Sequence, residues 1–522
     1  MKVSRCSMLF LSLLLVVACG SEKVPDTKMS VKVLSEEYAE PSFADSSRAA
    51  RVKPFASVVE SIFQKYANEN HIPGLAYGVV VGDELVIQNG LGFASLESSI
   101  PATLQTNFRI ASMSKSFTAL AILKLRDEGK LQLTDPVAKH LPAFHKLRYP
   151  TSDSPSITIE NLLTMSAGFP EDNPWGDRQL ADSDDDLLRL LESGLSFSNT
   201  PGIEYEYSNL GFASLGKIIS VVSGQPYQQY IRDQILQPLR MNDARWEYQE
   251  VAPEKLALGY RWEDNQWKKE ALLGDGSYGA MGGLICSVED FSKYMAFNIQ
   301  AWPPRNEIES SIALRSSLRE MHQLQKIGSV SDTYMNQPCP VVAGYGYGLG
   351  YRKDCRNITT LRHGGGLPGF GSEWRFYQEY GIGIVSLSNR TYAGLGATNA
   401  LVLDTLLKLA HLKPLKLPVS KILSQRQQEI VKVIQSWEPH DQAIFAENFF
   451  LDRSLDHWKA DTKKFWEEVG EIRKIETLRP ENQLRGTFMI ECEKKNLNVF
   501  FTLTPEREPL VQQLDIWVTD KP

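Results

Sequence analysis

The sequence predicts a mixed α/β (α+β) sandwich, in which an antiparallel sheet is flanked by helices and a helical subdomain is inserted between two groups of strands. Apolar residues at 55–66 recur at helical spacing, and residues 75–81 and 84–88 then indicate a β-hairpin that turns at Gly82-Asp83. Later strands are expected at 346–351, 358–363, 372–377 and 381–389, before a helix at 397–410. Helices at both ends of such a strand set are expected to pack on the sheet.

Length and composition set the broad class. A chain of 522 residues is longer than a domain with a single hydrophobic core usually is, so two domains are expected. Hydrophobic content of 42% and charged content of 23% are typical of a globular protein. The net charge of −7 argues against a nucleic-acid partner, because phosphate binding needs a basic surface. The eight histidines are scattered without metal-ligand spacing, and we expect no metal and no cofactor.

The proline-containing segment 411–418 is predicted to separate two domains, at 53–412 and 420–522. The second part is expected to have helices at 420–437, 441–452 and 455–468, and strands near 470–478, 485–492, 497–504 and 510–518. This order predicts a small α+β domain. It resembles the nuclear-transport-factor-2-like class, although no residue motif supports that resemblance. Packing or oligomerisation is the simpler role, and ligand binding is the alternative.

The helix predicted after Ser112 organises the larger domain. Its run is apolar except at Thr118 and Lys124, so the helix is expected to be buried nearly all round, and Gly129 is expected to end it. Lys115 lies three residues after Ser112 on the same helical face and can reach its hydroxyl. Burial favours an uncharged lysine, which can accept a proton. On this tetrapeptide alone, a helix cap followed by a surface lysine is the simpler interpretation.

Two further motifs follow in order, Tyr207-Ser-Asn209 and His363-Gly-Gly365-Gly366. Together with Ser112-x-x-Lys115 they resemble the three signatures of the serine β-lactamase and penicillin-binding superfamily. The flanking stretches 157–170 and 279–284 also resemble that family, in particular a class C β-lactamase-related serine hydrolase. The resemblance covers roughly residues 53–410 and implies the β-lactamase/DD-peptidase type of fold.

The resemblance implies a role for each motif residue. Ser112 would be the nucleophile that forms an acyl-enzyme, and Lys115 and Tyr207 would share the proton transfers, with the identity of the base left open. A tyrosine close to lysine-like charges is expected to lose its proton more easily than a free phenol. Asn209 would hydrogen-bond a substrate amide. The N–H groups of Ser112 and Gly366 would form the oxyanion hole.

His363 stands where this family commonly has lysine, so the positive charge expected there becomes dependent on pH. That substitution favours a peptidase or esterase over a β-lactamase. The leading substrates are cell-wall-type D-amino-acid peptides, as for a DD-carboxypeptidase, or small esters. A β-lactamase and a lipid-anchored penicillin or peptidoglycan sensor with little turnover remain alternatives. Met165 replaces the family's usual histidine, with a consequence that the sequence leaves open.

The N-terminus predicts export. Lys2 and Arg5 precede a short apolar run at 8–17, which is typical of a signal peptide over residues 1–18. Residues 16–19 end in Cys19 and resemble a bacterial lipobox, which implies a lipid anchor at Cys19. Gly20-Ser21 follows the cysteine in place of the aspartate that commonly signals inner-membrane retention, so the periplasmic face of the outer membrane is expected. An ordinary signal peptide with a chance cysteine is the alternative. Residues 19–52 are expected to form a flexible tether.

Export permits disulfides. Cys339 and Cys355 bracket a glycine- and tyrosine-rich stretch that a disulfide could close, and the sequence leaves open whether it forms. Cys286 is expected to be a buried, small apolar residue.

Overall fold

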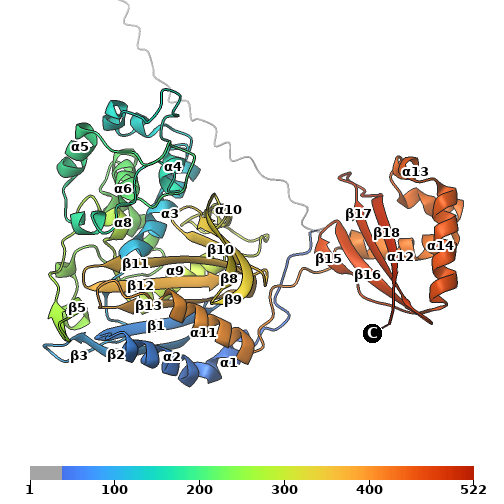
Figure 1. Cartoon of the computed structure of the whole chain (residues 1–522), viewed down its shortest axis with the longest axis horizontal. Coiled ribbons are helices and arrows are strands. Elements are labelled where there is room, and N and C mark those ends of the chain that lie inside the picture. Colours follow the sequence, from blue (N-terminus) through green and yellow to red (C-terminus); the bar gives the residue numbers. More distant parts are fainter. Residues whose placement is uncertain (1–37, 522) are drawn as a thin grey trace, which may run out of the picture.

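The computed structural model describes residues 38–521, and its largest element is a nine-stranded antiparallel sheet in the order β3-β2-β1-β13-β12-β11-β10-β9-β8 (Figure 1). The strands are β1 (Gly74–Val81), β2 (Glu84–Ser95), β3 (Ile100–Pro101), β8 (Lys326–Tyr334), β9 (Gln337–Tyr345), β10 (Gly350–Asp354), β11 (Thr359–Leu367), β12 (Phe370–Tyr377) and β13 (Ile382–Ser388). The first and last strands of this sheet in chain order meet in its middle, where β1 pairs with β13 from Leu75↔Ser388 to Val81↔Ile382. The predicted antiparallel sheet is confirmed.

The hairpin of β8 and β9 was not predicted from the sequence. Most of β8 is exposed on both faces, so its residues lack the alternation of apolar and polar side chains that marks a half-buried strand. It forms because its backbone pairs with β9, which in turn pairs with β10.

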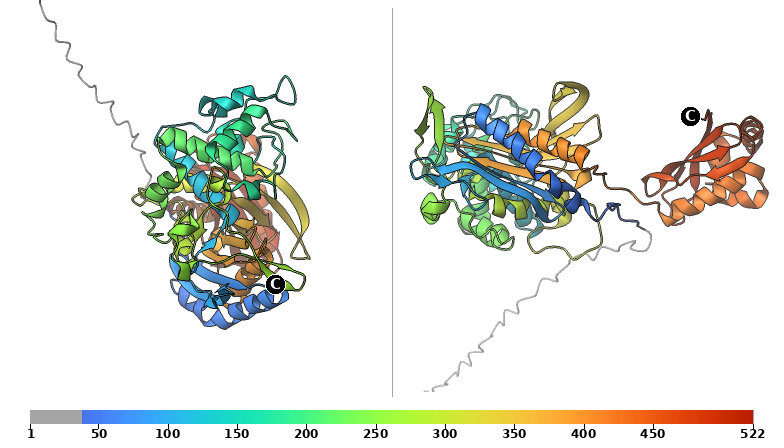
Figure 2. Two further views of the ribbon diagram at one scale, coloured as in Figure 1. Left: turned by 90° about the vertical axis from the view of Figure 1, so that its left-hand side faces the viewer. Right: turned by 90° about the horizontal axis from the view of Figure 1, so that it is seen from below.

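Helices cover both faces of the sheet. One face is covered by α1 (Arg48–Val52), α2 (Ala56–Glu69) and α11 (Gly396–Leu409) (Figure 2). These helices bury a cluster that includes Phe63, Tyr77, Ile384 and Leu403. On the other face, α9 (Val288–Ile299) packs against β1 and β13. The sandwich arrangement expected from the sequence is therefore confirmed.

The region between β4 and β8 is largely helical. It contains α3 (Ser114–Asp127), α4 (Ile159–Leu163), α5 (Asp184–Ser193), α6 (Asn209–Ser223), α7 (Tyr227–Ile231), α8 (Gly279–Gly282) and α10 (Arg315–Met321). Two short antiparallel pairs accompany them, β4 (Phe108–Arg109) with β7 (Ile285–Cys286), and β5 (Tyr260–Glu263) with β6 (Gln266–Lys269).

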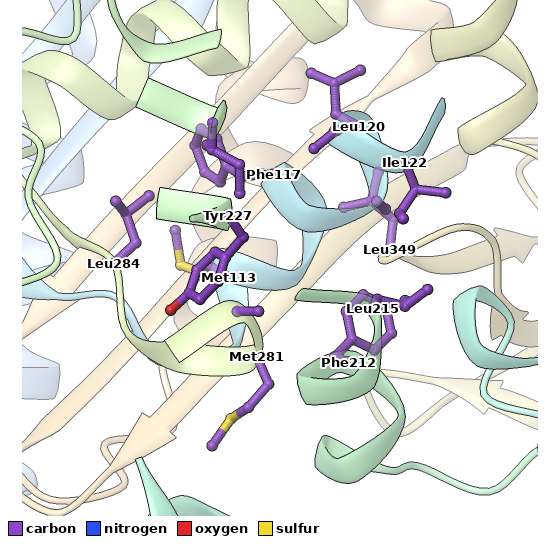
Figure 3. Packing of buried hydrophobic residues seen from close by; sticks show 14 of the residues in the cluster. Met113, Phe117, Leu120, Ile122, Phe212, Leu215, Tyr227, Met281, Leu284 and Leu349 are labelled. Atoms are coloured by element: carbon purple, nitrogen blue, oxygen red, sulfur yellow. The ribbon is translucent and has the colours of Figure 1, made fainter. Parts of the chain in front are cut away.

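The centre of this region is α3, which is buried from Ser114 to Leu123, as predicted. Figure 3 shows Phe117 and Leu120 on α3 among side chains from α6, α8 and the loops around them. Phe117 also stacks on Tyr294 of α9, with ring centroids 3.9 Å apart. Each such buried apolar side chain contributes about 1.5–3 kcal/mol. The helix ends at the predicted place, where Gly129 takes a φ of +73°.

The C-terminal part has its own sheet and its own hydrophobic cluster. Its sheet has the order β14-β16-β17-β18, with β15 also paired to β16. Its elements are α12 (Lys421–Ser436), α13 (Phe449–Asp452), α14 (Leu455–Val469), β14 (Ile472–Ile475), β15 (Arg479–Asn482), β16 (Arg485–Cys492), β17 (Asn496–Leu503) and β18 (Val511–Thr519).

The helix predicted at 441–452 is wrong as a single element. A 3-10 helix (Pro439–Ile444) and the short α13 replace it, with extended backbone at Phe445 between them. The aromatic side chains of this stretch drive the break, because Phe445 stacks on Trp437 while Phe449 stacks on Trp458. The boundaries at 53–412 and 420–522 and the nuclear-transport-factor-2-like resemblance stay predictions.

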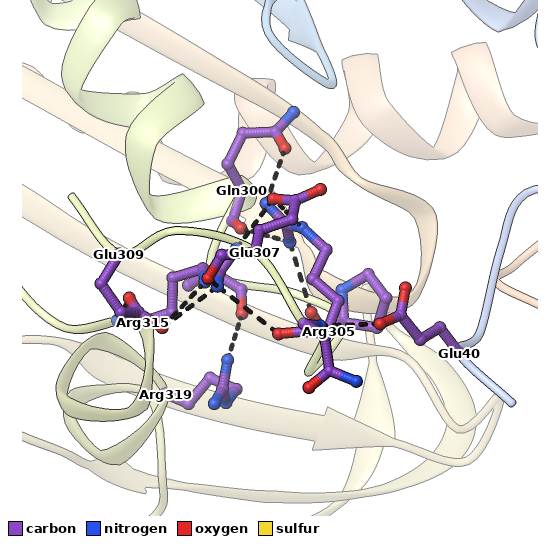
Figure 4. A network of polar contacts seen from close by, with 10 residues as sticks. Glu40, Gln300, Arg305, Glu307, Glu309, Arg315 and Arg319 are labelled. Atoms are coloured by element: carbon purple, nitrogen blue, oxygen red, sulfur yellow. Dashed lines mark hydrogen bonds and ion pairs between the residues drawn. The ribbon is translucent and has the colours of Figure 1, made fainter. Parts of the chain in front are cut away.

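The predicted flexible tether of residues 19–52 is wrong for its last part. Ser42 forms a β-bridge with Lys416, and the backbone N–H of Asn306 donates to Glu40 Oε1 at 2.7 Å (Figure 4). Arg48 lies with its guanidinium 3.4 Å from the centre of the Phe43 ring and donates to the carbonyl of Gly381 at 3.2 Å. These contacts order a stretch whose composition alone suggested none.

The predicted signal peptide over residues 1–18 and the predicted lipidation site Cys19 lie outside the described residues. Among residues 38–521, no helix has the length and apolar character that a membrane crossing requires. Cys339 of β9 and Cys355 form a disulfide, which answers the question that the sequence left open. Cys286 is buried with a free thiol, as predicted.

Candidate active site

Ser112 lies in a single 3-10 turn (Ala111–Met113) immediately before α3. Ala111 has a φ of +50°, a strained conformation for a residue with a Cβ. The hydroxyl of Ser372 on β12 donates to the carbonyl of Ile110 at 2.7 Å and so holds the strained turn against the sheet. The serine is therefore presented by a sharp turn between the sheet and a buried helix.

Lys115 is wholly buried, and its Nζ lies 3.0 Å from Ser112 Oγ. The same Nζ donates to Asn209 Oδ1 at 2.7 Å and to the carbonyl of Met281 at 2.9 Å. Burial lowers the pKa of Lys115 to about 7, although the nearby carboxylates of Asp177 and Asp172 oppose the shift. Near neutral pH, a substantial fraction of Lys115 is uncharged and able to accept a proton from Ser112.

The structure corrects the role expected for Asn209. Its side chain is 0% exposed, and it lies beneath the cleft rather than facing a substrate. Its Oδ1 accepts from Lys115, and its Nδ2 donates to Asn173 Oδ1 at 2.6 Å. Both ends of the amide are thus used within the protein, so Asn209 positions Lys115.

Tyr207 lies over the same lysine, with Lys115 Nζ 4.8 Å from the centre of its ring. The ring is half-buried and its accessible part lines the cleft. Burial raises the pKa of Tyr207 well above its ordinary value, and the carboxylates of Asp177 and Asp172 add to the increase. The structure thus favours a neutral phenol over the easily ionised one that was expected, because burial is the largest influence on its pKa.

His363 at the cleft is neutral. Its Nδ1 lies 2.6 Å from the carbonyl of Gly364, which can only accept, so Nδ1 carries the proton. Its Nε2 then accepts a hydrogen bond from the hydroxyl of Tyr345 at 2.9 Å. Burial, together with the charge of Lys115, lowers the pKa of His363 to about 3. The expected pH-dependent positive charge is therefore absent over the ordinary pH range, and this corrects the sequence-based interpretation.

The glycines of β11 allow the sheet to approach the serine turn. A Cβ added at Gly365 would lie 2.4 Å from the carbonyl of Ile110 and 2.3 Å from Ser372 Oγ, so a larger residue cannot fit without movement. At Gly364 the nearest atom would be 3.9 Å away. Pairing of β11 with β10 ends at Arg362, which leaves the following residues to border the cleft. The oxyanion-hole role of the N–H groups of Ser112 and Gly366 stays a prediction.

These residues line a cleft of about 430 Å³. Its lining residues are Ser112, Asn173, Pro174, Asp177, Tyr207, His363, Gly364, Gly365, Gly366 and Tyr392. The structure thus brings together all the predicted residues of the three motifs, with Lys115 and Asn209 below the surface of the cleft.

A group of residues around 172–177 was not predicted from the sequence. Asp172 accepts from the N–H groups of Asn209 and Leu210 at 2.7 and 2.8 Å, at the N-terminus of α6, where a carboxylate is favourable. Asp177 Oδ2 accepts from the hydroxyl of Tyr392 at 3.1 Å. No local motif marks these residues, because their partners lie tens to hundreds of positions away in the sequence.

Comparison with known proteins identifies the family. The Beta-lactamase family model matches residues 59–407, which is most of the chain. Protein flp of Staphylococcus aureus (strain MW2) is 33% identical over 251 residues, covering 47% of this chain and 49% of that protein. Beta-lactamase-like protein 2 of Dictyostelium discoideum is 30% identical over 304 residues, covering 57% and 54%. The chain spans about half the length of the curated relatives that it matches.

Solved structures share the fold. The octameric penicillin-binding protein homologue from Pyrococcus abyssi has a TM-score of 0.58 at 21% identity, covering 89% of this chain and 98% of that one. EstCE1, a hydrolase with promiscuous acyltransferase activity, has a TM-score of 0.56 at 20% identity, covering 69% and 100%.

The family match and the shared fold place the chain in the β-lactamase and penicillin-binding superfamily. The chain belongs to the Beta-lactamase family through residues 59–407.

Proposed function

We propose that the protein hydrolyses esters or amides through an acyl-enzyme at Ser112. The observation that carries the proposal is the 3.0 Å contact between Ser112 Oγ and the wholly buried Lys115, whose pKa is lowered to about 7. A lysine in that state is a base of suitable strength for the serine hydroxyl at neutral pH.

In the acylation step, uncharged Lys115 takes the proton of Ser112 while Oγ attacks the substrate carbonyl carbon. The new C–O bond places negative charge on the carbonyl oxygen, which the N–H groups of Ser112 and Gly366 stabilise. Collapse breaks the bond to the leaving group, which departs with a proton passed on from Lys115. Tyr207 stays a neutral phenol and can relay that proton, since its raised pKa disfavours the phenolate.

Deacylation reverses the proton transfers. A water molecule gives its proton to Lys115 and attacks the ester carbonyl, and the acyl–oxygen bond breaks as Ser112 Oγ recovers a proton. Asn209 serves both steps by holding Lys115 in place through the 2.7 Å bond. Positioning of this kind supplies much of the rate gain in such sites.

For the substrate, we propose small esters or amides ahead of the carboxylate-bearing cell-wall peptides that the sequence placed first. The described residues that line the cleft include no lysine or arginine, and His363 is neutral. A DD-carboxypeptidase-like activity, a β-lactamase and a penicillin or peptidoglycan sensor with little turnover remain candidates that the following experiment separates.

The experiment follows acylation by mass spectrometry with a fluorophosphonate, a penicillin and a short-chain ester. Ser112→Ala and Lys115→Met should abolish labelling. Lys124→Met, in the last turn of the same helix, should be labelled normally. Rapid ester turnover supports the proposal, persistent penicillin adducts favour a peptidase or sensor, and rapid penicillin loss favours a β-lactamase. Absence of labelling at Ser112 with every probe contradicts the proposed mechanism.

We also propose, from the sequence, that lipid at Cys19 anchors the protein at the periplasmic face of the outer membrane. Growth with a fatty-acid analogue should label the wild-type chain and leave Cys19→Ala unlabelled. Labelling of neither chain contradicts the anchor.

A further inference from the structure

A buried carboxylate borders the cleft with one oxygen unused. Asp177 is only 3% exposed, and its Oδ2 accepts from Tyr392. Within residues 38–521, its Oδ1 has no hydrogen-bond partner. Burying a carboxylate oxygen without a partner is costly, and among the described residues Asp177 Oδ1 is the only carboxylate oxygen in that state. The position of Asp177 in the cleft lining makes a ligand the natural partner.

The catalytic lysine does not fill this role. An ammonium group has three donors, and those of Lys115 are directed at Ser112 Oγ, Asn209 Oδ1 and the carbonyl of Met281. The negative charge of Asp177 acts on Lys115 through space and keeps its pKa from falling further. The three donors of Lys115 are therefore engaged elsewhere, and a second donor that reaches Asp177 Oδ1 does not displace the lysine.

The remaining surroundings suit a cation. Tyr207 and Tyr392 both present aromatic rings to the cleft, and Tyr392 is 42% exposed. Aromatic faces attract ammonium groups, and a carboxylate beside them adds charge and a hydrogen-bond acceptor. Among the described lining residues there is no lysine or arginine that would compete with a cation or bind an anion.

We propose that Asp177 is a specificity residue that binds a protonated amine on the acyl part of the substrate. The proposal rests on the hydrolase function proposed above and names its substrate class, which is aminoacyl esters and amides rather than acyl groups bearing a carboxylate. In the acyl-enzyme, the ammonium group lies against Asp177 Oδ1 and the tyrosine rings while its carbonyl carbon is bonded to Ser112 Oγ.

The test uses three thiobenzyl esters of equal chain length, 3-aminopropanoyl, butanoyl and 3-carboxypropanoyl, at pH 7.5. The shorter alanyl ester, in both stereoisomers, is compared with its isostere, the 2-methylpropanoyl ester. In the full-length wild-type protein, kcat/KM for at least one amine should exceed that of its methyl isostere by about 10-fold or more, the effect of a hydrogen bond to a charged group. The 3-carboxypropanoyl ester should be the poorest substrate.

Asp177→Asn keeps the size of the side chain and removes its charge. In this variant, kcat/KM for an ester whose acyl group carries an amine should lie within about 3-fold of kcat/KM for the ester with a methyl group in its place. Asp185→Asn, on the exposed face of α5, removes the same charge elsewhere and should keep the wild-type ranking. If Asp177→Asn does not fold, wild-type binding of 2-aminoethylboronate against propylboronate gives the same comparison, with tighter binding of the amine expected.

The inference is overturned if the wild-type protein hydrolyses the amine-bearing ester and its methyl isostere at equal rates, or if it prefers the carboxylate-bearing ester. It is also overturned if Asp177→Asn retains the preference for the amine. These outcomes leave the hydrolase function intact as long as butanoyl ester hydrolysis depends on Ser112. Absence of Ser112-dependent hydrolysis of every ester contradicts the proposed function itself.

Discussion

Replacing Asn209 by aspartate tests whether Lys115 is the base and whether Asn209 acts through it. The amide Oδ1 of Asn209 lies 2.7 Å from Lys115 Nζ, so Asn209→Asp places a carboxylate oxygen at the same point with almost no change in shape. The perturbation adds charge at the lysine, and it also replaces the donor to Asn173 Oδ1 by an oxygen, so the Asn173 amide must turn over to donate instead.

The magnitude follows from the electrostatics. An opposite charge this close raises a pKa by about 1–3 units, which would move Lys115 from about 7 to about 8–10. Half of Lys115 is uncharged at pH 7 in the wild-type protein, and this fraction falls to between about 0.09 and about 0.001 in the variant. Activity at pH 7 should therefore fall by about 5-fold to about 500-fold and recover as the pH rises toward 10.

The assay measures kcat/KM for a small neutral ester from pH 5 to pH 10. The wild-type profile should rise with a midpoint near pH 7, and the midpoint for Asn209→Asp should lie at least one unit higher. Asn68→Asp, on the exposed side of α2, adds the same charge far from the site and should leave the midpoint unchanged. An unmoved midpoint in Asn209→Asp refutes the assignment of Lys115 as the base, and loss of activity at every pH refutes a purely positioning role for Asn209.

Three further predictions concern the turn, the sheet and the histidine. Gly365→Ala should reduce kcat by about 100-fold, because its Cβ would displace the serine turn. Gly364→Ala should reduce kcat much less. Steady-state kinetics with matched melting curves measure both variants. Reducing the Cys339–Cys355 disulfide, which closes 16 residues, should lower the free energy of unfolding by about 3 kcal/mol, measured by denaturant titration with and without reductant. His363→Gln should leave the acid midpoint of the pH–rate profile near 7, because the histidine is already neutral above a pKa of about 3.

Each prediction has an outcome that contradicts it. Equal losses in the two glycine variants would mean that close approach to the turn is not what requires glycine. Unchanged stability on reduction would show that the disulfide does not constrain the unfolded chain. Disappearance of the acid midpoint in His363→Gln would identify the histidine, whose unperturbed pKa is near 6.5, as the titrating group.

The sequence was sufficient for many of the helices and strands and for naming the motif residues. Periodicity located the hairpin at residues 75–88, the buried run after Ser112 and the later helices, because amphipathic spacing is a local property of the chain. It failed for β8, whose pairing depends on a neighbouring strand, and at Phe445, where aromatic stacking broke an expected helix.

The state of each catalytic group was decided by tertiary structure alone. Whether Lys115 is charged and whether Tyr207 ionises both depend first on burial, and the carboxylates of Asp172 and Asp177, thirty or more positions from Tyr207, act on both groups. The sequence named Asn209 and His363 but not their partners, so it placed one against the substrate and gave the other a titratable charge. The sequence specifies which residues are present. Their desolvation and their distances from one another exist only after the chain has folded, and these two factors determine the chemistry of the site.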